Sequence, residues 1–330
     1  MSDHSITAAP TAPSPRRLLI VAAFAAVYLI WGSTYLGIRF AIDSMPPLLM
    51  AGTRSVLAGA VLLAWARGVR HEPAAPARGW WHALVVGGGL LLVGNGGVTL
   101  AEQYVPSGLA SLLVATVPMW LAVLGWAAGV GARPRPLVWL GLALGLAGVA
   151  LLAGGPAEAP SGPAGQPGHY GLGTGLLLAA SLTWAATSLY SKKNAIAPTV
   201  LVGVGMQMLC GGALLCAASA LTGELQTLDL AHITPRAWGA WLYLIGAGSL
   251  VGFTAYAWLL QAVEPTLVGT YAFVNPVVAV ALGWAFAGEH LTAAMGGGAA
   301  LIVVAVALVV LGQRPKAPKE EAAPVNAVAE

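Results

Sequence analysis

The chain has 330 residues, of which 58% are hydrophobic and only 8% are charged, and its mean hydropathy is +0.80. An average soluble domain carries roughly 25% charged residues, so this composition excludes an ordinary water-soluble fold. The net charge of +3, with no basic run interleaved with aromatic residues, argues against nucleic acid as a partner.

Ten apolar segments, each long enough to cross a bilayer as a helix, follow one another along the chain. They run approximately over residues 18–38, 48–66, 83–101, 108–128 and 137–154, and then over 171–190, 200–221, 238–260, 267–288 and 292–311. Membrane strands would alternate polar and apolar residues, whereas these runs are continuous. The sequence therefore predicts an all-α polytopic membrane protein with ten transmembrane helices.

The distribution of Lys and Arg predicts how these helices are oriented, because positive loops stay on the cytoplasmic side. Twelve positive residues fall on one side of the predicted spans: Arg16, Arg17, Arg67, Arg70, Arg78, Arg133, Arg135, Lys192, Lys193, Arg314, Lys316 and Lys319. Only Arg39 and Arg236 fall on the other side, and Arg54 lies within the second span. We expect both termini in the cytoplasm, with disordered tails at 1–17 and 313–330 and a linker at 155–170 on the opposite side of the membrane.

The two halves of the chain repeat each other. Seven residues recur 158 positions later: Gln103, Val105, Leu109, Pro118, Leu124, Gly125 and Trp126 return as Gln261, Val263, Leu267, Pro276, Leu282, Gly283 and Trp284. Trp31 and Thr34 recur 153 positions later as Trp184 and Thr187. Five helices are an odd number, so a second copy, 171–312, must be inverted relative to the first, 18–154. Inverted repeats are typical of transporters, with the solute site between the copies near the middle of the membrane.

Three runs in the first half are distinctive: Trp31-Gly32-Ser33-Thr34-Tyr35, Pro46-Pro47 followed by Arg54, and the run AEQYVPSGLA from Ala101 to Ala110 followed by Val117-Pro118. On these runs the chain resembles the drug/metabolite transporter superfamily, in its EamA branch and especially its YedA-like inner-membrane exporters. The resemblance covers residues 18–311. It implies two inverted EamA repeats around a central cavity, and export of small metabolites, amino acids or xenobiotics. The second repeat departs from the pattern, with Glu264-Pro265 where the first has Pro106-Ser107.

The sequence offers no chemistry of catalysis or ATP hydrolysis. No GxxxxGK[ST] loop occurs, so coupling would come from an ion gradient or from the solute's own gradient. No HExxH or GxSxG motif occurs either, and the histidines fall in predicted loops or tails: His4, His71, His82, His169, His232 and His290. We therefore expect no enzyme activity, no cofactor and no metal site.

Charged residues inside a membrane are costly and are functional candidates by default. Arg54 lies six residues into the second span, and Glu102 closes the third span on the same side. One interpretation is that both face the mouth of the cavity, where they pair or contact the solute. The alternative is that Arg54 extends to the lipid headgroups and Glu102 is a solvated end charge.

Trp31, Trp120 and Trp184 are predicted near the middle of their spans, whereas the other tryptophans fall near span ends, where indoles anchor in the membrane interface. We expect the mid-span aromatic and polar residues to line the solute cavity: Tyr28, Trp31, Thr34, Tyr35, Asn95, Trp120, Trp184, Thr187 and Asn275. Simple packing of the mid-span tryptophans is the competing interpretation.

Pro118 and Pro276 should kink the fourth and ninth spans at equivalent places, because proline removes a helical hydrogen bond. Such kinks are either hinges for gating or static features. Glycines four residues apart, such as Gly248 and Gly252, predict close helix packing, which could include a homodimer face. The sequence thus predicts a secondary transporter that exports a small solute by alternating access. An importer or facilitator, or a membrane subunit that transports nothing, is the alternative.

Overall fold

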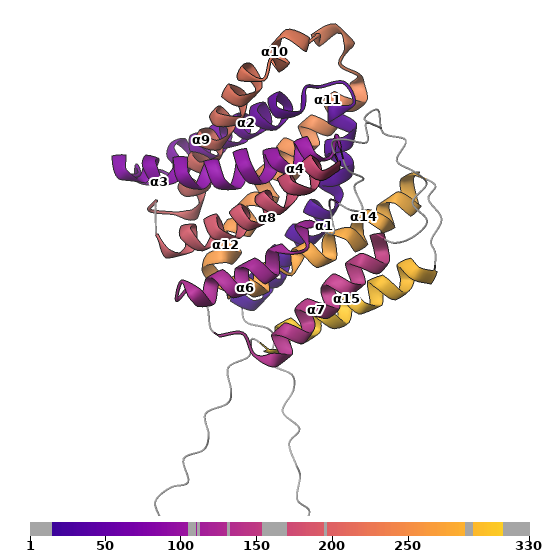
Figure 1. Ribbon diagram of the computed structural model, residues 1–330. Helices are drawn as coiled ribbons and strands as arrows, with labels where there is room; N and C mark the ends of the chain where they lie inside the picture. The colour runs from indigo at the N-terminus through magenta and orange to yellow at the C-terminus, as the bar shows by residue number, and fades with distance from the viewer. Residues whose placement is uncertain are drawn as a thin grey trace, which may run out of the picture.

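The protein is described here by a computed structural model, which covers residues 15–104, 110, 113–130, 133–153, 170–194, 197–287 and 293–312. Every regular element within these ranges is helical, as Figure 1 shows. Residues 1–14 of the expected N-terminal tail, the whole expected C-terminal tail and most of the expected linker lie outside the described residues, so those parts of the predicted domain organisation stay predictions. Residues 15–17 are described and form the start of the first helix.

The described helices of the first half account for five spans. They are α1 (Pro15–Ile42), α2 (Pro47–Gly68), the continuous run of α3 (Ala77–Gly87), η1 (Gly88–Asn95) and α4 (Gly96–Ala101), then α6 (Val117–Ala127) and α7 (Pro136–Ala153). The third span begins earlier than the sequence predicted. His82 therefore lies inside α3 rather than in a loop, which corrects that expectation.

The second half repeats this order. Its spans are α8 (Tyr170–Lys193), α9 (Val200–Leu221), the run of α11 (Pro235–Tyr243), η3 (Leu244–Phe253) and α12 (Thr254–Ala262), then α13 (Pro265–Val268) with α14 (Tyr271–Ala287), and α15 (Ala293–Gly312). The short helices α10 (Glu224–Thr227) and η2 (Leu230–His232) lie between α9 and α11. Six of the described helices are long and apolar enough to cross a membrane unaided, and shorter apolar helices account for other spans.

The second and seventh spans, α2 and α9, pack through glycines that have no side chain to keep the backbones apart. A β-carbon at Gly59 would lie 2.8 Å from the carbonyl oxygen of Gly205, and one at Gly52 would lie 3.1 Å from that of Gly212. Shifting by 153 residues turns Gly52 into Gly205 and Gly59 into Gly212, so the two contacts exchange. The helix pair therefore lies on a two-fold pseudosymmetry axis that relates the repeats.

Other contacts obey the same exchange. The first span contacts the eighth and ninth, and the sixth contacts the third and fourth. The fifth and tenth spans, α7 and α15, lie side by side at one edge of the molecule in Figure 1. The protein is therefore an all-α polytopic membrane protein of ten transmembrane helices, arranged as two inverted five-helix repeats.

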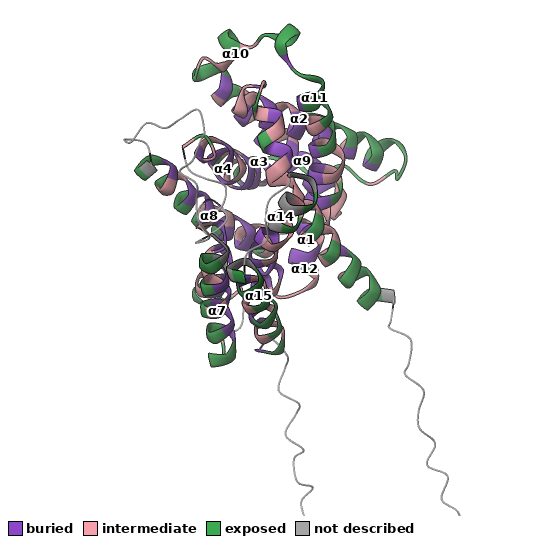
Figure 2. Cartoon of the chain, turned by 90° about the vertical axis from the view of Figure 1, so that its right-hand side faces the viewer, coloured by how far each residue is buried: buried purple, intermediate pink, exposed green. Residues whose placement is uncertain are grey.

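The third and eighth spans both widen into a π-helix at their centres. The segment η1 ends at Asn95 and η3 ends at Phe253, positions that correspond under the 158-residue shift. π-Helical turns free backbone groups from the regular ladder and are frequent at functional sites. In Figure 2 the buried residues concentrate where the central helices meet, and exposed residues cover α10 and the outer sides of α7 and α15.

Each repeat supplies a carboxylate to the start of a helix in the other repeat. Glu224, just after α9, accepts hydrogen bonds from the backbone amides of Leu48 (3.1 Å) and Leu49 (2.9 Å) at the start of α2. Glu72, just after α2, accepts a hydrogen bond from the hydroxyl of Thr199, the N-cap of α9. The free amides and the positive dipole end of a helix favour a carboxylate there. These contacts fix α2 and α9 to each other at both ends.

Candidate functional site

A cavity lies between the two repeats, with about 810 Å³ of space free of protein atoms when its open side is included. Its walls come from α1, α2, η1, α4 and α6 of the first repeat and from α8, α9, η3 and α14 of the second. The face at which α1 begins is called here the N-terminal face. On α1 the lining runs from Trp31 to Ile38, and on α2 it includes Arg54 and Ser55, so the cavity extends toward the opposite face.

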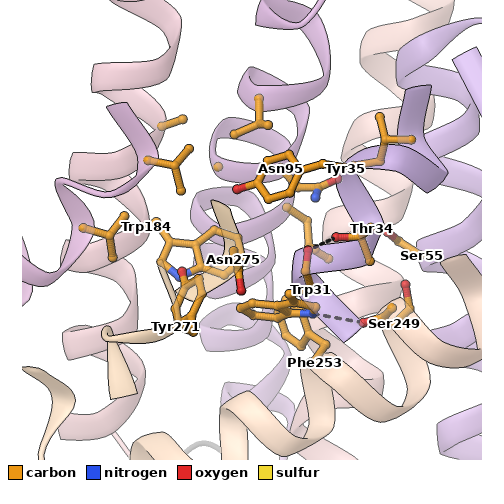
Figure 3. Close-up of a pocket in the computed structure, with 18 of the residues that line it drawn as sticks. Trp31, Thr34, Tyr35, Ser55, Asn95, Trp184, Ser249, Phe253, Tyr271 and Asn275 are labelled. Atoms are coloured by element: carbon orange, nitrogen blue, oxygen red, sulfur yellow. Dashed lines mark hydrogen bonds between the residues drawn. The ribbon is translucent and has the colours of Figure 1, made fainter. Parts of the chain in front are cut away.

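Aromatic rings from both repeats meet at one end of this cavity. The ring centres of Trp31 and Trp184 lie 5.7 Å apart with the planes at 82°, and Tyr271 meets Trp31 edge-on at 4.9 Å. Tyr256 lies 5.0 Å from Trp31, and Phe253 completes the cluster. Figure 3 shows Trp31, Phe253 and Tyr271 below Asn95 and Tyr35. We call Trp31, Trp184, Phe253, Tyr256 and Tyr271 the aromatic layer.

Hydrogen bonds fix the two tryptophans of the layer. The indole Nε1 of Trp31 donates to the carbonyl oxygen of Gly248 (3.3 Å), a backbone group of the π-helix η3. The Nε1 of Trp184 donates to the hydroxyl of Tyr256 (2.9 Å), which also bonds Ser188 (2.6 Å). A buried indole needs such a partner, and here each partner comes from the eighth span.

Arg54 projects into the cavity from the first half of α2. Its Nη2 donates to the side-chain oxygen of Asn95 at 2.6 Å, and its Nε has no hydrogen-bond partner in the described structure. The residue is only 5% exposed, so its guanidinium does not reach the outer surface. Asn275, on the facing helix α14, is 2% exposed and its Oδ1 also has no partner. Two residues that line the cavity, Arg54 and Asn275, therefore each have a buried side-chain atom that the described chain leaves without a hydrogen-bond partner.

Seven of the residues that the sequence predicted for the site line this one cavity: Trp31, Thr34, Tyr35, Arg54, Asn95, Trp184 and Asn275. Four others lie outside its lining. Tyr28 bonds Thr270 (2.6 Å) toward the N-terminal face, and Thr187 packs against Gly89 in η1. Trp120 packs in the core next to the cavity, and its buried Nε1 has no hydrogen-bond partner among the described residues.

Glu102 is the fourth residue outside the lining. Its Oε1 is buried without a partner, and no ion pair joins it to Arg54 within 4.0 Å in the described structure. The described structure therefore shows no direct ion pair between Arg54 and Glu102, which was one of the arrangements that the sequence suggested.

The two prolines occupy different backbone settings. Pro276 lies inside α14, whereas Pro118 lies in the first turn of α6, directly after a turn at residues 115–116. In the first turn of a helix the amide hydrogen has no acceptor within the helix, so a proline there breaks no helical hydrogen bond. The expected equivalent kinks therefore differ in form, and a hinge role for either proline stays a prediction.

The cavity also contains residues that the sequence analysis did not select, including Ser55, Ser181, Ser249, Phe253 and Tyr271. Phe253 could have been found by adding 158 to Asn95. Nothing in the sequence distinguished the serines as site residues. Ser55 and Ser181 bond backbone carbonyls, as serine does in many membrane helices, so a serine in a span does not by itself indicate a solute site.

On the N-terminal side of the aromatic layer the helices are joined by further bonds. Lys192, at the end of α8, donates to the carbonyl oxygens of Leu260 and Val263, both at 2.8 Å. His82 bonds the hydroxyl of Tyr190 between α3 and α8. Together with the bond of Tyr28 to Thr270, these contacts hold the sixth span to the third and eighth and the first to the ninth. The helices are thus joined directly on this side of the aromatic layer, and the cavity lies on the other side.

The comparison with known proteins follows the same division into two halves. The model of the EamA-like transporter family matches residues 18–154 and again 171–311. The chain belongs to the EamA-like transporter family. It is a multi-pass membrane protein, and like the family it is a transporter of small solutes.

Several relatives match this EamA-like transporter along most of its length. It is 40% identical to the uncharacterized inner membrane transporter YedA of Escherichia coli K12 over 312 residues, which cover 94% of this chain and 97% of YedA. It is 28% identical to a probable amino-acid metabolite efflux pump of Salmonella typhimurium, covering 87% and 93%. A solved crystal structure is 25% identical, with a TM-score of 0.68, and covers 92% of this chain and 99% of its own.

Proposed function

We propose that this protein exports a small solute across the bacterial inner membrane by alternating access, with both termini in the cytoplasm. The observation that carries the proposal is the cavity between inverted repeats, with one tryptophan of each repeat, Trp31 and Trp184, at its closed end. A transporter must expose its site to one side at a time. Two tryptophans that the inverted units contribute, one each, can belong to the barrier in both states.

The contacts of the two tryptophans support this mechanism. Trp184 packs on Gly94 of the first repeat, and Trp31 packs on Gly252 of the second. The same 158-residue shift relates the two glycines. Exchanging the roles of the repeats would therefore open the N-terminal side and close the other with the same kinds of contact. The outward direction of transport is supported by one relative, which is named a probable amino-acid metabolite efflux pump.

A transport assay tests the proposal directly. Cells that contain the protein are loaded with a panel of labelled amino acids, and purified protein is reconstituted in liposomes loaded with the same panel. We expect faster efflux of at least one solute, and a loss of roughly ten-fold or more in Trp184→Leu, since a tryptophan at a binding surface commonly contributes over 2 kcal/mol. Trp65→Leu is the matched control, because Trp65 is 54% exposed on the outer surface.

Two outcomes would contradict the proposal. Uptake that runs inward under every gradient would make the protein an importer or facilitator on the same scaffold. Equal loss in Trp184→Leu and Trp65→Leu would remove the aromatic layer from the transport path.

The orientation is tested by labelling cysteines from outside the cell. Cys210 and Cys216 are first replaced by Ala, and single cysteines are introduced at Ala8, Ala322 and Gln226. The positive loops predict that a membrane-impermeant maleimide labels only position 226 in intact spheroplasts and reaches positions 8 and 322 after permeabilisation. Labelling of one terminus from outside would contradict the shared location of the termini.

A further inference from the structure

Arg54 carries a charge that its surroundings in the cavity do not neutralise. Among the described residues that line the cavity, Arg54 alone is charged, and the others are neutral polar or apolar. Its hydrogen-bond partner is the neutral amide oxygen of Asn95, and its Nε has none. A buried cation is costly unless an anion and further hydrogen bonds compensate it. The described protein supplies part of the hydrogen bonding and no anion within ion-pair distance.

The charged groups nearest to Arg54 do not change this conclusion. Glu102 lies outside the cavity lining, and no ion pair joins it to Arg54 within 4.0 Å in the described structure. No other acidic residue lines the cavity in the described part of the chain. The local electrostatic field in the cavity therefore favours a solute group that is negative.

The shape of the Arg54 guanidinium indicates which kind of negative group the solute would carry. Arginine presents its donors in a planar fork that matches the two oxygens of a carboxylate. Nε is one arm of that fork and has no partner. The bond to Asn95 holds the fork in place, and the amide nitrogen of Asn95 can donate to the same anion.

The opposite end of the cavity suits an apolar group. The aromatic layer presents Trp31, Trp184, Phe253 and Tyr271 to the cavity, and Asn275 adds one unpartnered acceptor beside them. An apolar part of the solute would pack well against these rings, because aromatic faces bind apolar surface well. An acceptor such as Asn275 Oδ1 would fit a single hydroxyl or amide hydrogen on that body.

We propose that the cavity selects a monocarboxylate with an apolar or aromatic body, which binds with its carboxylate on Arg54 and Asn95 and its body on the aromatic layer. This inference rests on the proposed function for the location of the site, and it adds the chemical class of the solute. It does not depend on the direction or the coupling of transport.

Three probes of equal size test this assignment by binding, without transport. They are 3-phenylpropanoate, 3-phenylpropanamide and 3-phenylpropylamine, titrated into purified protein in nanodiscs and followed by calorimetry. A hydrogen bond to a charged group contributes about 1.5–3 kcal/mol. We therefore expect 3-phenylpropanoate to bind roughly 10- to 100-fold more tightly than the amide, and the amine to bind most weakly.

Two substitutions test the residues independently. Arg54→Gln removes the charge, and Asn95→Asp places a carboxylate where the Asn95 oxygen already accepts from Arg54, which neutralises the guanidinium while keeping its partner. Both variants should lose the preference for 3-phenylpropanoate over the amide. Asn95→Asp keeps the buried pair intact, so the test stands even where Arg54→Gln does not fold. Glu102→Gln is the control, and it should retain the preference.

The inference is overturned if the amide binds as tightly as the carboxylate, if the amine binds most tightly, or if 3-phenylpropanoate does not bind at millimolar concentration. It is also overturned if the preference survives in Asn95→Asp or disappears in Glu102→Gln. A protein that exports a neutral or cationic solute and shows no carboxylate preference would retain the proposed function and lose this inference. Carboxylate binding without transport of any solute would retain this inference and contradict the proposed function.

Discussion

The indole of Trp184 lies directly on the backbone of Gly94, and a β-carbon added at Gly94 would lie only 2.6 Å from Cε3 of the ring. The equivalent contact joins Trp31 to Gly252, where the added β-carbon would also lie 2.6 Å from the indole, at Nε1. Both glycines belong to π-helical segments. Each tryptophan of the aromatic layer is therefore positioned by a glycine of the opposite repeat.

Gly94→Ala and Gly252→Ala should each displace a tryptophan. The added methyl group cannot be accommodated by a flexible side chain end, because a rigid indole occupies the space. Overpacking of this kind costs about 1–3 kcal/mol of the free energy of unfolding, and we expect transport to fall with it. Thermal unfolding monitored by tryptophan fluorescence measures the first effect.

Gly246→Ala is the matched control for these two substitutions. Gly246 lies in the same π-helix as Gly252, and nothing lies within 4 Å of a β-carbon added there. This variant should unfold at or slightly above the temperature of the unmodified protein, because alanine favours helix over glycine. Equal destabilisation at all three positions would show that the tryptophan contacts are not the cause.

Glu224→Gln should weaken the attachment of the α2 start to the second repeat. The Glu224 carboxylate accepts bonds from the amides of Leu48 and Leu49 and from the hydroxyl of Ser219 (2.8 Å). A neutral amide can accept fewer bonds and does not complement the helix dipole, which should cost about 1–2 kcal/mol. The exposed Asp43 provides the control, and Asp43→Asn should leave the unfolding temperature unchanged. No change in Glu224→Gln would mean that solvent replaces the carboxylate without loss.

Tyr256→Phe should destabilise the closed N-terminal side. The hydroxyl of Tyr256, a fully buried residue, satisfies Trp184 Nε1 and bonds Ser188. Leaving the buried indole donor unpartnered costs about 1–3 kcal/mol. The comparison is Tyr243→Phe, because Tyr243 is 40% exposed and its partner Ser33 also bonds the carbonyl oxygen of Ile30, so its loss should stay within about 0.5 kcal/mol. Similar losses in both variants would argue against a special role for the Tyr256 hydroxyl.

Gly59→Val should separate α2 from α9. A β-carbon at Gly59 meets backbone atoms of Gly205 and Leu209, both at 2.8 Å, and backbone cannot move aside as a side chain can. We expect poor accumulation of the variant in the membrane or a clear fall in its unfolding temperature. Gly68→Val, in the last turn of the same helix, has nothing within 4 Å and should accumulate normally.

The number and order of the helices could be predicted from the sequence because lipid imposes a strict requirement. Each span must be apolar over its whole length and satisfy its own backbone hydrogen bonds. The sequence also predicted that the repeat mates Trp31 and Trp184 lie near the middle of their spans and line the cavity. The depth of a residue in its span can be counted along the sequence, so two residues at equal depth from opposite faces can be recognised without a structure.

The contacts of the polar site residues depend on tertiary packing, which the spacing of residues in the sequence does not reveal. Arg54 could have paired with Glu102 or extended to the headgroups, and the choice of Asn95 follows from how α2 lies against η1 and α4. Thr187 and Tyr28 have the residue types of site residues, yet the neighbouring helices turn them toward Gly89 and Thr270. The π-helical turns shift the register of the helix faces in the third and eighth spans, which periodicity alone does not reveal.

Composition and repeat spacing thus determined the membrane environment, the ten helices and the inversion of the second half, since all three follow from what each segment requires by itself. The tertiary structure alone decided that Arg54 has a neutral partner and a free Nε, that glycines seat the two tryptophans, and that Glu102 lies outside the cavity lining. Those outcomes depend on distances between helices that are far apart in the sequence. Such distances are set by the sum of many side-chain contacts rather than by any one motif.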